Sequence, residues 1–430
     1  MSDKINILYD GDILTRIFEK NSGRSGVFFT AYNVFKKLTK RDDVNCILVA
    51  KALKCKSLKN FLDVYFPDVN VKIVSISSNN PMVILYEKLL DKKYHYKNNK
   101  KHFKMFLTKI PMFFLSFIIK PLNKIHNKKL LSKYNNDNWI YFSPFIVNNF
   151  FSKLNLDKYS ILYDVIPIIF NQNYKNSCWF KNLYDSINSA ENYFVISDSA
   201  KNDFLKYYPQ IDKNKIHTTL LACDERFKPQ VEERIKAAKK KYNLPEDKKY
   251  VFSLCTLEPR KNLIRAVKTF IEFIKKNNID DMVYVLGGGQ WDNFIGKLEN
   301  EIENLGEYKD KIIKAGYVDD EDLAPLYSGA EWFVYTSQYE GFGLPPLEAM
   351  NCACPVITSN NSSLPEVVGD AAISIDFDSD AQHIEAYEKY YYHPEIREEY
   401  RKKGLERAKL FSWEKCVDTM VEIMKSNMQK

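Results

Sequence analysis

Short apolar runs alternate along the chain with longer segments whose apolar residues recur every three or four positions. In the C-terminal half, residues 251–256, 331–335 and 355–358 are apolar enough for buried strands. Residues 263–274 have the spacing of an amphipathic helix. Buried strands that alternate with helices are typical of a parallel sheet covered on both faces, so we predict an α/β fold.

The N-terminal half repeats this alternation. The pattern predicts a helix over residues 27–38, another that begins near Ala200 after a Ser-Asp-Ser cap, and strands at 5–9, 46–50, 71–75, 159–165 and 193–196. We predict two Rossmann-like domains, residues 1–227 and 228–430, joined by a charged linker near 227–250. The last helix is expected to pack back toward the N-terminal domain.

Two carboxylates bracket a glycine-containing loop in the C-terminal half, where Glu340 and Glu348 flank the segment Gly-Phe-Gly-Leu-Pro-Pro-Leu. Glycines let backbone N–H groups approach a ligand, and the prolines begin a helix whose first N–H groups favour an anion. Carboxylates accept paired hydrogen bonds from the vicinal hydroxyls of sugars and ribose. The sequence therefore predicts a site for a phosphorylated sugar, with a capped surface helix as the alternative.

A second loop of this half places cations at a helix start. Arg260 and Lys261 precede the helix at 263–274. Cations there oppose the helix dipole unless an anion lies between them, so we interpret the pair as diphosphate ligands. Simple solvated charges are the alternative.

Several spaced motifs together resemble a known family over residues 253–376. They are TLEPRKNL at 256–263, Gly-Tyr-Val at 316–318, the two glutamates separated by seven residues, and Ser-Leu-Pro-Glu-Val at 363–367 followed by Gly369. This region is similar to the nucleotide-binding half of the retaining glycosyltransferases of family four. The resemblance implies the GT-B fold, in which two Rossmann-like domains face each other across a cleft.

The resemblance also implies roles for individual residues. Arg260 and Lys261 would hold the donor diphosphate, Glu340 would contact the donor sugar, and Glu348 would bind the ribose hydroxyls. Further donor contacts are implied for Gly26, Thr256, Tyr317, Val318, Gly341, Phe342, Gly343 and Leu344, with Gly23 as the second choice for the first-loop glycine. Cys255 departs from the pattern, because relatives usually place glycine before the threonine.

The acceptor side is predicted from one segment of the N-terminal half. Residues 163–167 resemble the His-Asp-x-x-Pro segment of the family, with Tyr163 in place of the histidine and Asp164 at the position of the aspartate. Asp164 is expected to orient an acceptor hydroxyl, although a carboxylate at a strand end is also an ordinary turn former.

Composition narrows the cellular setting. With 430 residues, 45% of them apolar, the chain can bury two sizeable cores. The eight cysteines lack paired metal-ligand spacing, and the donor half has no Asp-x-Asp motif, so neither a metal nor a separate cofactor is expected. Without an export signal before the first strand, we expect a cytoplasmic protein.

One segment departs from the scaffold in charge. Residues 92–133 contain twelve lysines and no acidic residue, more positive charge than the net +8 of the whole chain. Their apolar centre, residues 110–119, is half of the roughly 20 residues that span a bilayer, so we expect peripheral contact with an anionic membrane. A covered core helix is the alternative. Aromatic and basic residues do not interleave here, and no nucleic-acid partner is expected.

Together with the family resemblance, which implies retention of configuration, these features predict a metal-independent hexosyltransferase of surface polysaccharide synthesis at the inner face of the cell membrane. GDP-mannose is the first choice of donor and a UDP-hexose the second; the acceptor would be a saccharide or a lipid-linked saccharide. A phosphorylase or epimerase on the same fold, and a non-catalytic carbohydrate-binding or partner subunit, remain as alternatives.

Overall fold

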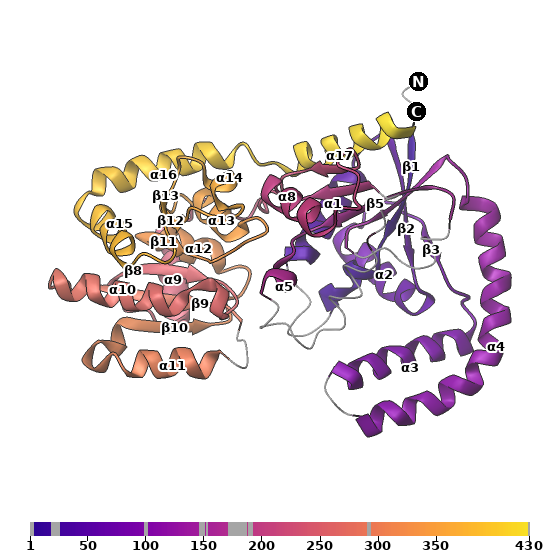
Figure 1. Ribbon diagram of the computed structural model, residues 1–430, viewed down its shortest axis with the longest axis horizontal. Helices are drawn as coiled ribbons and strands as arrows, with labels where there is room; N and C mark the ends of the chain where they lie inside the picture. Colours follow the sequence, from indigo (N-terminus) through magenta and orange to yellow (C-terminus); the bar gives the residue numbers. More distant parts are fainter. Residues whose placement is uncertain are drawn as a thin grey trace.

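The computed structural model describes residues 4–18, 26–98, 102–145, 151, 154–170, 187, 192–289 and 294–428. They form two α/β domains, which lie side by side in Figure 1. Each domain is built on one parallel sheet, so the predicted fold class is confirmed. Gly23 lies outside the described residues.

The N-terminal sheet has seven strands in the order β3-β2-β1-β4-β5-β6-β7. The strands are β1 (Ile5–Asp10), β2 (Val44–Ala50), β3 (Ile73–Ser75), β4 (Trp139–Ser143), β5 (Asp157–Leu162), β6 (Asn192–Val195) and β7 (Ile216–Thr218). The helical elements are η1 (Asp12–Phe18), α1 (Gly26–Leu38), α2 (Ala52–Tyr65), α3 (Pro81–Asn98), α4 (His102–Tyr134), α5 (Ile166–Ile169) and α8 (Asp198–Tyr207). The central strands are apolar because helices bury both faces.

The C-terminal sheet has six strands in the order β10-β9-β8-β11-β12-β13. The strands are β8 (Lys249–Leu254), β9 (Met282–Gly287), β10 (Ile312–Gly316), β11 (Trp332–Tyr335), β12 (Val356–Ser359) and β13 (Ile373–Ile375). The helical elements are α9 (Glu232–Lys241), η3 (Pro259–Lys261), α10 (Leu263–Lys276), α11 (Ile295–Glu303), η4 (Gly306–Lys311), α12 (Leu323–Gly329), α13 (Leu344–Asn351), α14 (Leu364–Val368), α15 (Asp380–Tyr392) and α16 (Pro394–Ala408). The strand order reverses between β8 and β11, and ligands of such sheets bind beyond the carboxyl ends of these two strands.

Two predicted strands end earlier than the sequence pattern indicated. The strand predicted over residues 159–165 ends at Leu162, because the Asp164 carboxylate accepts a hydrogen bond from the Ile166 N–H group at 3.0 Å and turns the chain. The strand predicted over 251–256 ends at Leu254. In both places the apolar pattern continues into the loop that follows the strand.

The last helix, α17 (Trp413–Met428), leaves the C-terminal domain and lies on the N-terminal one, as the yellow end of the chain shows in Figure 1. Its acidic residues Glu414 and Asp418 form ion pairs with Lys37 and Arg41. Farther along, Lys425 lies 2.7 Å from Asp43. Helix α17 therefore ties the two domains together.

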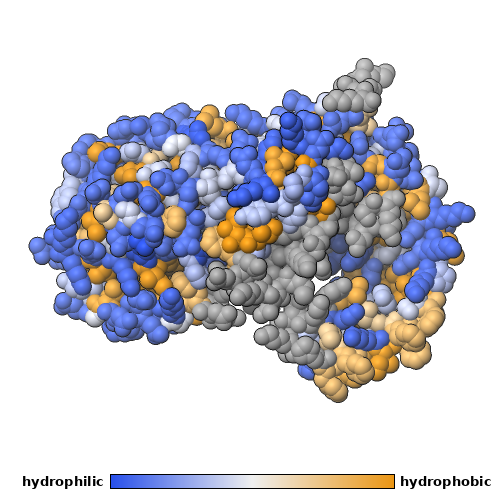
Figure 2. Space-filling model, in the orientation of Figure 1, coloured by the Kyte–Doolittle hydropathy of each residue, from blue (hydrophilic) through white to orange (hydrophobic). Residues whose placement is uncertain are grey.

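Helix α4 is much longer than the apolar run at its centre. It has 33 residues and contains Pro111 and Pro121. By length and composition its segment Phe103–Tyr134 could cross a membrane, and 17% of an 18-residue apolar stretch within it is buried. The ten-residue length of its apolar centre is therefore not an argument against a helix that spans the membrane. Figure 2 shows apolar surface gathered at the end of the domain formed by α3 and α4.

Candidate active site

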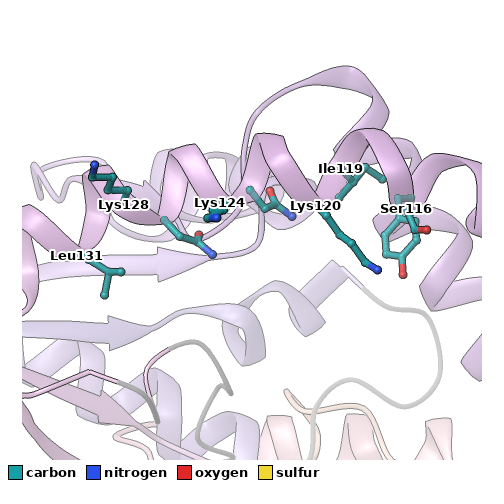
Figure 3. Close-up of a pocket in the computed structure, with 9 residues that line it drawn as sticks. Ser116, Ile119, Lys120, Lys124, Lys128 and Leu131 are labelled. Atoms are coloured by element: carbon teal, nitrogen blue, oxygen red, sulfur yellow. The ribbon is translucent and has the colours of Figure 1, made fainter.

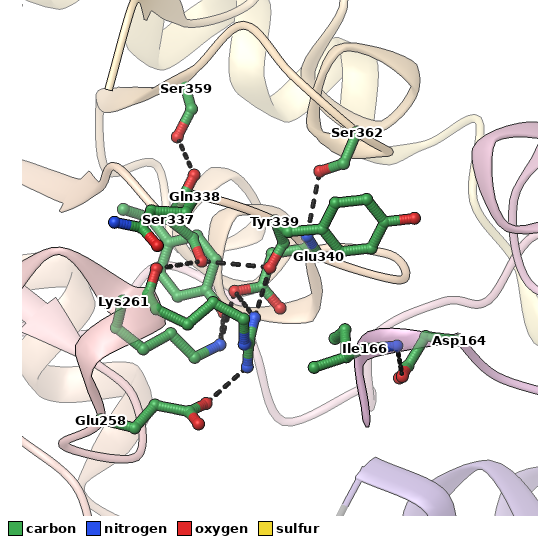
Figure 4. A network of polar contacts seen from close by, with 12 residues as sticks. Asp164, Ile166, Glu258, Lys261, Ser337, Gln338, Tyr339, Glu340, Ser359 and Ser362 are labelled. Atoms are coloured by element: carbon green, nitrogen blue, oxygen red, sulfur yellow. Dashed lines mark hydrogen bonds and ion pairs between the residues drawn. The ribbon is translucent and has the colours of Figure 1, made fainter. Parts of the chain in front are cut away.

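The loops that follow β8 and β11 bring the predicted donor ligands together. After β8, the chain makes the short helix η3 and then turns into α10 through Asn262, whose φ of 58° lies in the left-handed region that asparagine tolerates. After β11, residues 336–343 lead into α13. Figure 4 shows Lys261, Glu258 and Glu340 close together on this side, with Asp164 of the N-terminal domain nearby.

Arg260 is buried and holds the two loops together. Its guanidinium contacts the Glu258 carboxylate at 2.5 Å and the Glu340 carboxylate at 2.9 Å. It also donates a hydrogen bond to the backbone carbonyl of Tyr339. A planar guanidinium suits such a site because its donors lie in a fixed fork.

Lys261 reaches the same carboxylate from the other side. Its ammonium group donates to Glu340 at 2.5 Å and to the Tyr335 hydroxyl at 2.7 Å, and lies 4.9 Å from the centre of the Tyr335 ring. The anion between the two cations is thus the side chain of Glu340.

The environment of Glu340 keeps its carboxylate ionised. Burial would raise its pKa, but the charges of Lys261 and Arg260 and the hydrogen bond from Lys261 outweigh burial and lower the pKa to about 2. Ser362 accepts a hydrogen bond from the Glu340 backbone N–H group at 3.0 Å, which fixes the loop. Glu340 therefore offers a fixed negative charge.

The glycines after Glu340 lie where the two domains meet. A Cβ atom on Gly341 would lie 2.8 Å from the Asp164 Cβ atom and 3.0 Å from the Tyr163 carbonyl oxygen, both in the N-terminal domain. The Ser197 hydroxyl donates to the Gly341 carbonyl oxygen at 2.8 Å. Gly343 precedes α13 with a φ of 129°, which side chains rarely tolerate. Close packing here requires both glycines.

Phe342 and Leu344 complete this loop. The Phe342 side chain is buried, and its carbonyl oxygen accepts a hydrogen bond from Ser363 at 2.6 Å. A Cβ atom on Gly26 would lie 3.7 Å from a Leu344 methyl carbon, so the start of α1 faces the start of α13. The structure thus brings Gly26 to the same loop.

Asp164 approaches the cluster from the N-terminal domain. Burial raises its pKa to about 6, although the Ile166 N–H group and the charge of Arg260 act in the opposite direction. Arg260, Lys261 and Glu340 all influence this pKa, which places Asp164 within electrostatic reach of the donor cluster. The geometry suits a group that orients a hydroxyl between the domains.

Glu348 lies one turn along α13 and accepts a hydrogen bond from the Tyr327 hydroxyl at 3.0 Å. Burial raises its pKa to about 7, while Tyr327 and the charge of Arg226 lower it. Unlike Glu340, this carboxylate changes its protonation state near neutral pH.

This difference predicts a pH dependence of donor affinity. If the Glu348 carboxylate binds the ribose diol, the donor KM rises as the pH falls through about 7, because protonation removes a charge-assisted hydrogen bond. Such a bond contributes roughly 1.5–3 kcal/mol, so an increase of about tenfold or more is expected. Glu348→Gln should show the raised KM at every pH. Steady-state kinetics from pH 6 to pH 8.5 measure this, and an unchanged profile in the variant contradicts the assignment.

The other predicted ligands differ in their surroundings. Thr256 is exposed beyond the end of β8, and Tyr317 is 65% exposed, whereas Val318 is buried. Any contact of a base with residues 317 and 318 would therefore use the backbone or the exposed ring. In the described part of the chain, no cluster of three or more His, Cys, Asp or Glu side chains offers a metal site.

Two features of the site were not predicted. Gly288 has a φ of 133°, and a Cβ atom there would lie 1.8 Å from the Cys255 carbonyl oxygen, so only glycine fits beside the β8 loop. Glu366 accepts hydrogen bonds at 2.7 Å from the N–H groups of both Asp198 and Ser199, at the start of α8 in the other domain. The three consecutive glycines at 287–289 could have indicated the unusual backbone at Gly288. The contact of Glu366 with α8 depends on tertiary structure and has no signal in the sequence.

Residues 234–407 match the family model described as glycosyl transferases group 1. The O-antigen chain mannosyltransferase B of Escherichia coli is 35% identical over 57% of this chain and 63% of its own length. The serotype-specific mannosyltransferase WbdA of Escherichia coli is 32% identical over 49% of this chain and 26% of its own length. The chain thus spans less than two thirds of these curated relatives.

Among solved structures, Anabaena HepE in complex with UDP and glucose superimposes with a TM-score of 0.65 at 14% identity, over 98% of this chain and 100% of the other. This likeness shows the fold of both domains. The matched region contains both loops of the candidate site. Residues 234–407 therefore resemble a glycosyl transferases group 1 domain, and the chain has the two-domain GT-B fold.

Proposed function

We propose that this protein transfers a hexose, with mannose as the first choice, from a nucleotide diphosphate sugar to a saccharide or lipid-linked saccharide acceptor. The observation that carries the proposal is the buried cluster of Arg260, Lys261 and Glu340 beyond the ends of β8 and β11. The match to group 1 glycosyl transferases and the likeness to an O-antigen chain mannosyltransferase and a serotype-specific mannosyltransferase support it. GDP-mannose is the preferred donor in this proposal, and a UDP-hexose is the second choice.

The cluster is suited to stabilise a leaving diphosphate. Two carboxylates, Glu258 and Glu340, already balance the charges of Arg260 and Lys261. An incoming diphosphate would share these cations, and the N–H groups of Gly343 and Leu344 would supply further hydrogen bonds, since Pro345 and Pro346 of α13 have none. Preorganised donors of this kind stabilise charge as it develops, because they need not reorient during the reaction.

In a reaction that retains the configuration of the sugar, Glu340 and Asp164 would have different tasks. Glu340, ionised and held between two cations, would position the donor sugar and stabilise positive charge on it. Asp164 would orient the acceptor hydroxyl from the N-terminal domain. The acceptor hydroxyl would attack the sugar on the face from which the diphosphate departs. An oxygen of the leaving diphosphate would assist deprotonation of that hydroxyl. Contact between the domains would exclude water and favour transfer over hydrolysis.

A donor screen tests the reaction. Purified protein is mixed with GDP-mannose or a UDP-hexose and a saccharide acceptor, and the released nucleotide and the product are identified. Transfer with release of nucleoside diphosphate is expected, together with a rise in thermal midpoint on donor binding. Sugar 1-phosphate formed with inorganic phosphate would identify a phosphorylase instead, and no turnover with any donor would favour a non-catalytic partner.

We propose further that α4 contacts the cytoplasmic face of a membrane. Its exposed apolar residues recur three and four positions apart and so share one side of the helix, namely Phe103, Phe106, Leu107, Ile110, Phe113, Phe114, Phe117 and Ile118. We call these eight residues the apolar stripe. Phe113, Phe114 and Phe117 are each more than 60% exposed. A long apolar side flanked by lysines suits a helix that lies in the membrane interface.

The topology favours a helix that lies on the membrane over one that spans it. The chain leaves β3, passes through α3 and α4, and returns to β4 of the same parallel sheet. A spanning α4 would have to carry α3 across as well, yet α3 contains Lys88, Lys92 and Lys93. A helix in the interface needs no such crossing, and each nearby lysine adds about 1 kcal/mol of attraction to anionic lipid.

Vesicle flotation tests this contact. The triple variant Phe113→Ser, Phe114→Ser, Phe117→Ser should bind vesicles containing phosphatidylglycerol at least about tenfold more weakly, because each buried phenylalanine contributes roughly 1.5–3 kcal/mol. A matched control replaces three exposed apolar residues elsewhere, Val64, Val231 and Leu410, with serine. Equal flotation of the two triple variants would contradict a specific role of the apolar stripe.

A further inference from the structure

We propose that the concave surface between α3 and α4 binds the phosphate group of an anionic lipid, with the acyl chains along the apolar stripe. This site extends the proposed membrane contact and rests on it for the placement of the acyl chains. It lies outside the candidate active site and needs none of its residues.

The surface forms an open groove of about 660 Å³. Its lining residues are Tyr86 of α3 and, from α4, Ser116, Ile119, Lys120, Asn123, Lys124, Asn127, Lys128 and Leu131. Figure 3 shows Lys120, Lys124 and Lys128 one after another along α4, with Lys120 extending away from the helix. The lining combines three cations with apolar carbon, as an amphiphilic ligand requires.

The three lysines carry charge that the described part of the chain does not balance. They lie four residues apart, so successive ammonium groups share one side of α4 and repel each other. No ion pair among the described residues includes any of them. In sequence, the nearest acidic residues are Asp91 and Asp137. An anion held between the lysines would relieve this repulsion.

The polar groups between the lysines suit a phosphate ester. The Asn123 side-chain oxygen accepts a hydrogen bond from the Ser78 N–H group at 3.0 Å, so its NH₂ group is left as a donor. The Asn127 side-chain oxygen is buried and accepts no hydrogen bond from the described residues. Phosphate oxygens would accept hydrogen bonds from the Asn123 NH₂ group and from the lysines.

The side of α4 that carries this site changes from apolar to basic along its length. Phe113 and Phe117 are followed on the same side by Lys120 and Lys124, with Pro121 at the change. Proline removes a helix hydrogen bond and causes bends, and in Figure 1 α4 changes direction between the part beside α3 and the part beside the sheet. A lipid along this side would place its chains on phenylalanine and its phosphate among the lysines.

Calorimetric titration of the full chain tests the site. The probe is a short-chain phosphatidate kept below its micelle concentration, so that binding needs no membrane surface. Binding to the wild-type protein is expected, and at least a tenfold loss of affinity in the triple variant Lys120→Gln, Lys124→Gln, Lys128→Gln. The matched control is the triple variant Lys104→Gln, Lys129→Gln, Lys133→Gln, which removes the same charge from another side of the same helix.

Each outcome decides the proposal. Loss in the first triple variant with retention in the control supports the site, whereas equal affinity in both variants overturns it in favour of general surface charge. Inorganic phosphate that binds as tightly as the phosphatidate overturns the lipid assignment. The thermal shift with nucleotide diphosphate is recorded for every variant. If nucleotide diphosphate shifts the thermal midpoint of no protein, the wild type included, the proposed transferase activity is contradicted. The lipid result is unaffected by that outcome.

Discussion

The double variant Arg260→Ala, Lys261→Ala is expected to transfer hexose on the order of 100-fold more slowly than the wild-type protein. Both cations contact Glu340, and in the proposed reaction both stabilise the charge that grows on the leaving diphosphate. Their removal leaves Glu258 and Glu340 buried without these partners, so the free energy of unfolding should also fall. Turnover is therefore measured below the thermal midpoint of the variant.

A control on the adjoining helix separates the site from general charge. Arg265 and Lys268 of α10 form ion pairs with Asp378 and Glu301 at 2.6 and 2.7 Å. The variant Arg265→Ala, Lys268→Ala removes the same charge and should keep turnover within about twofold, because surface ion pairs contribute little. Near-normal transfer by the Arg260 and Lys261 double variant would refute their assignment.

The single change Gly341→Ala is expected to lower transfer by tenfold or more with little effect on donor affinity. Its new Cβ atom would lie 2.8 Å from the Asp164 Cβ atom and 3.0 Å from a backbone oxygen of the other domain. Backbone cannot yield as a flexible side chain does, so the domains must separate. Apart from Gly26, the predicted donor ligands belong to the C-terminal domain, whereas transfer requires both domains.

Kinetics with separate determination of kcat and donor KM distinguish these effects. Gly296→Ala is the matched control, because a Cβ atom there meets nothing within 4 Å. A variant Gly341→Ala with wild-type kcat would show that contact between the domains at this position is not needed for transfer. A large rise in donor KM at unchanged kcat would place Gly341 in donor binding instead.

The sequence pattern predicted strands such as β11 and β12, whose residues are all buried and mostly apolar. It gave no prediction for β4 and β9, although both are equally central in their sheets. It failed to predict where a strand ends when the apolar run continues beyond it. This is the case at residues 163–165, where the Asp164 side chain turns the chain. It also failed for α4, since an apolar run of ten residues does not reveal that lysine-rich flanks continue the same helix. The spacing of apolar residues indicates whether a segment is a strand or a helix, but not where that element ends.

The candidate site was predictable where its residues lie in loops of one domain. Arg260, Lys261 and Glu340 each follow a buried strand, and neighbouring parallel strands bring such loops to one edge of the sheet. The contact of Gly341 with Asp164 was not predictable, because it joins residues of different domains. The bonds between Glu366 and α8 depend in the same way on how the domains meet.

The central claim is that the C-terminal domain binds the diphosphate of a nucleotide sugar between Arg260, Lys261 and the N–H groups of Gly343 and Leu344 at the start of α13. Calorimetric titration with GDP, GMP and guanosine, repeated with the uridine series, tests it most directly. The account predicts that in one series the diphosphate binds at least about tenfold more tightly than the monophosphate, and that Arg260→Ala, Lys261→Ala abolishes this difference. Equal affinity for diphosphate and monophosphate in both series, or no binding of either diphosphate, would contradict it.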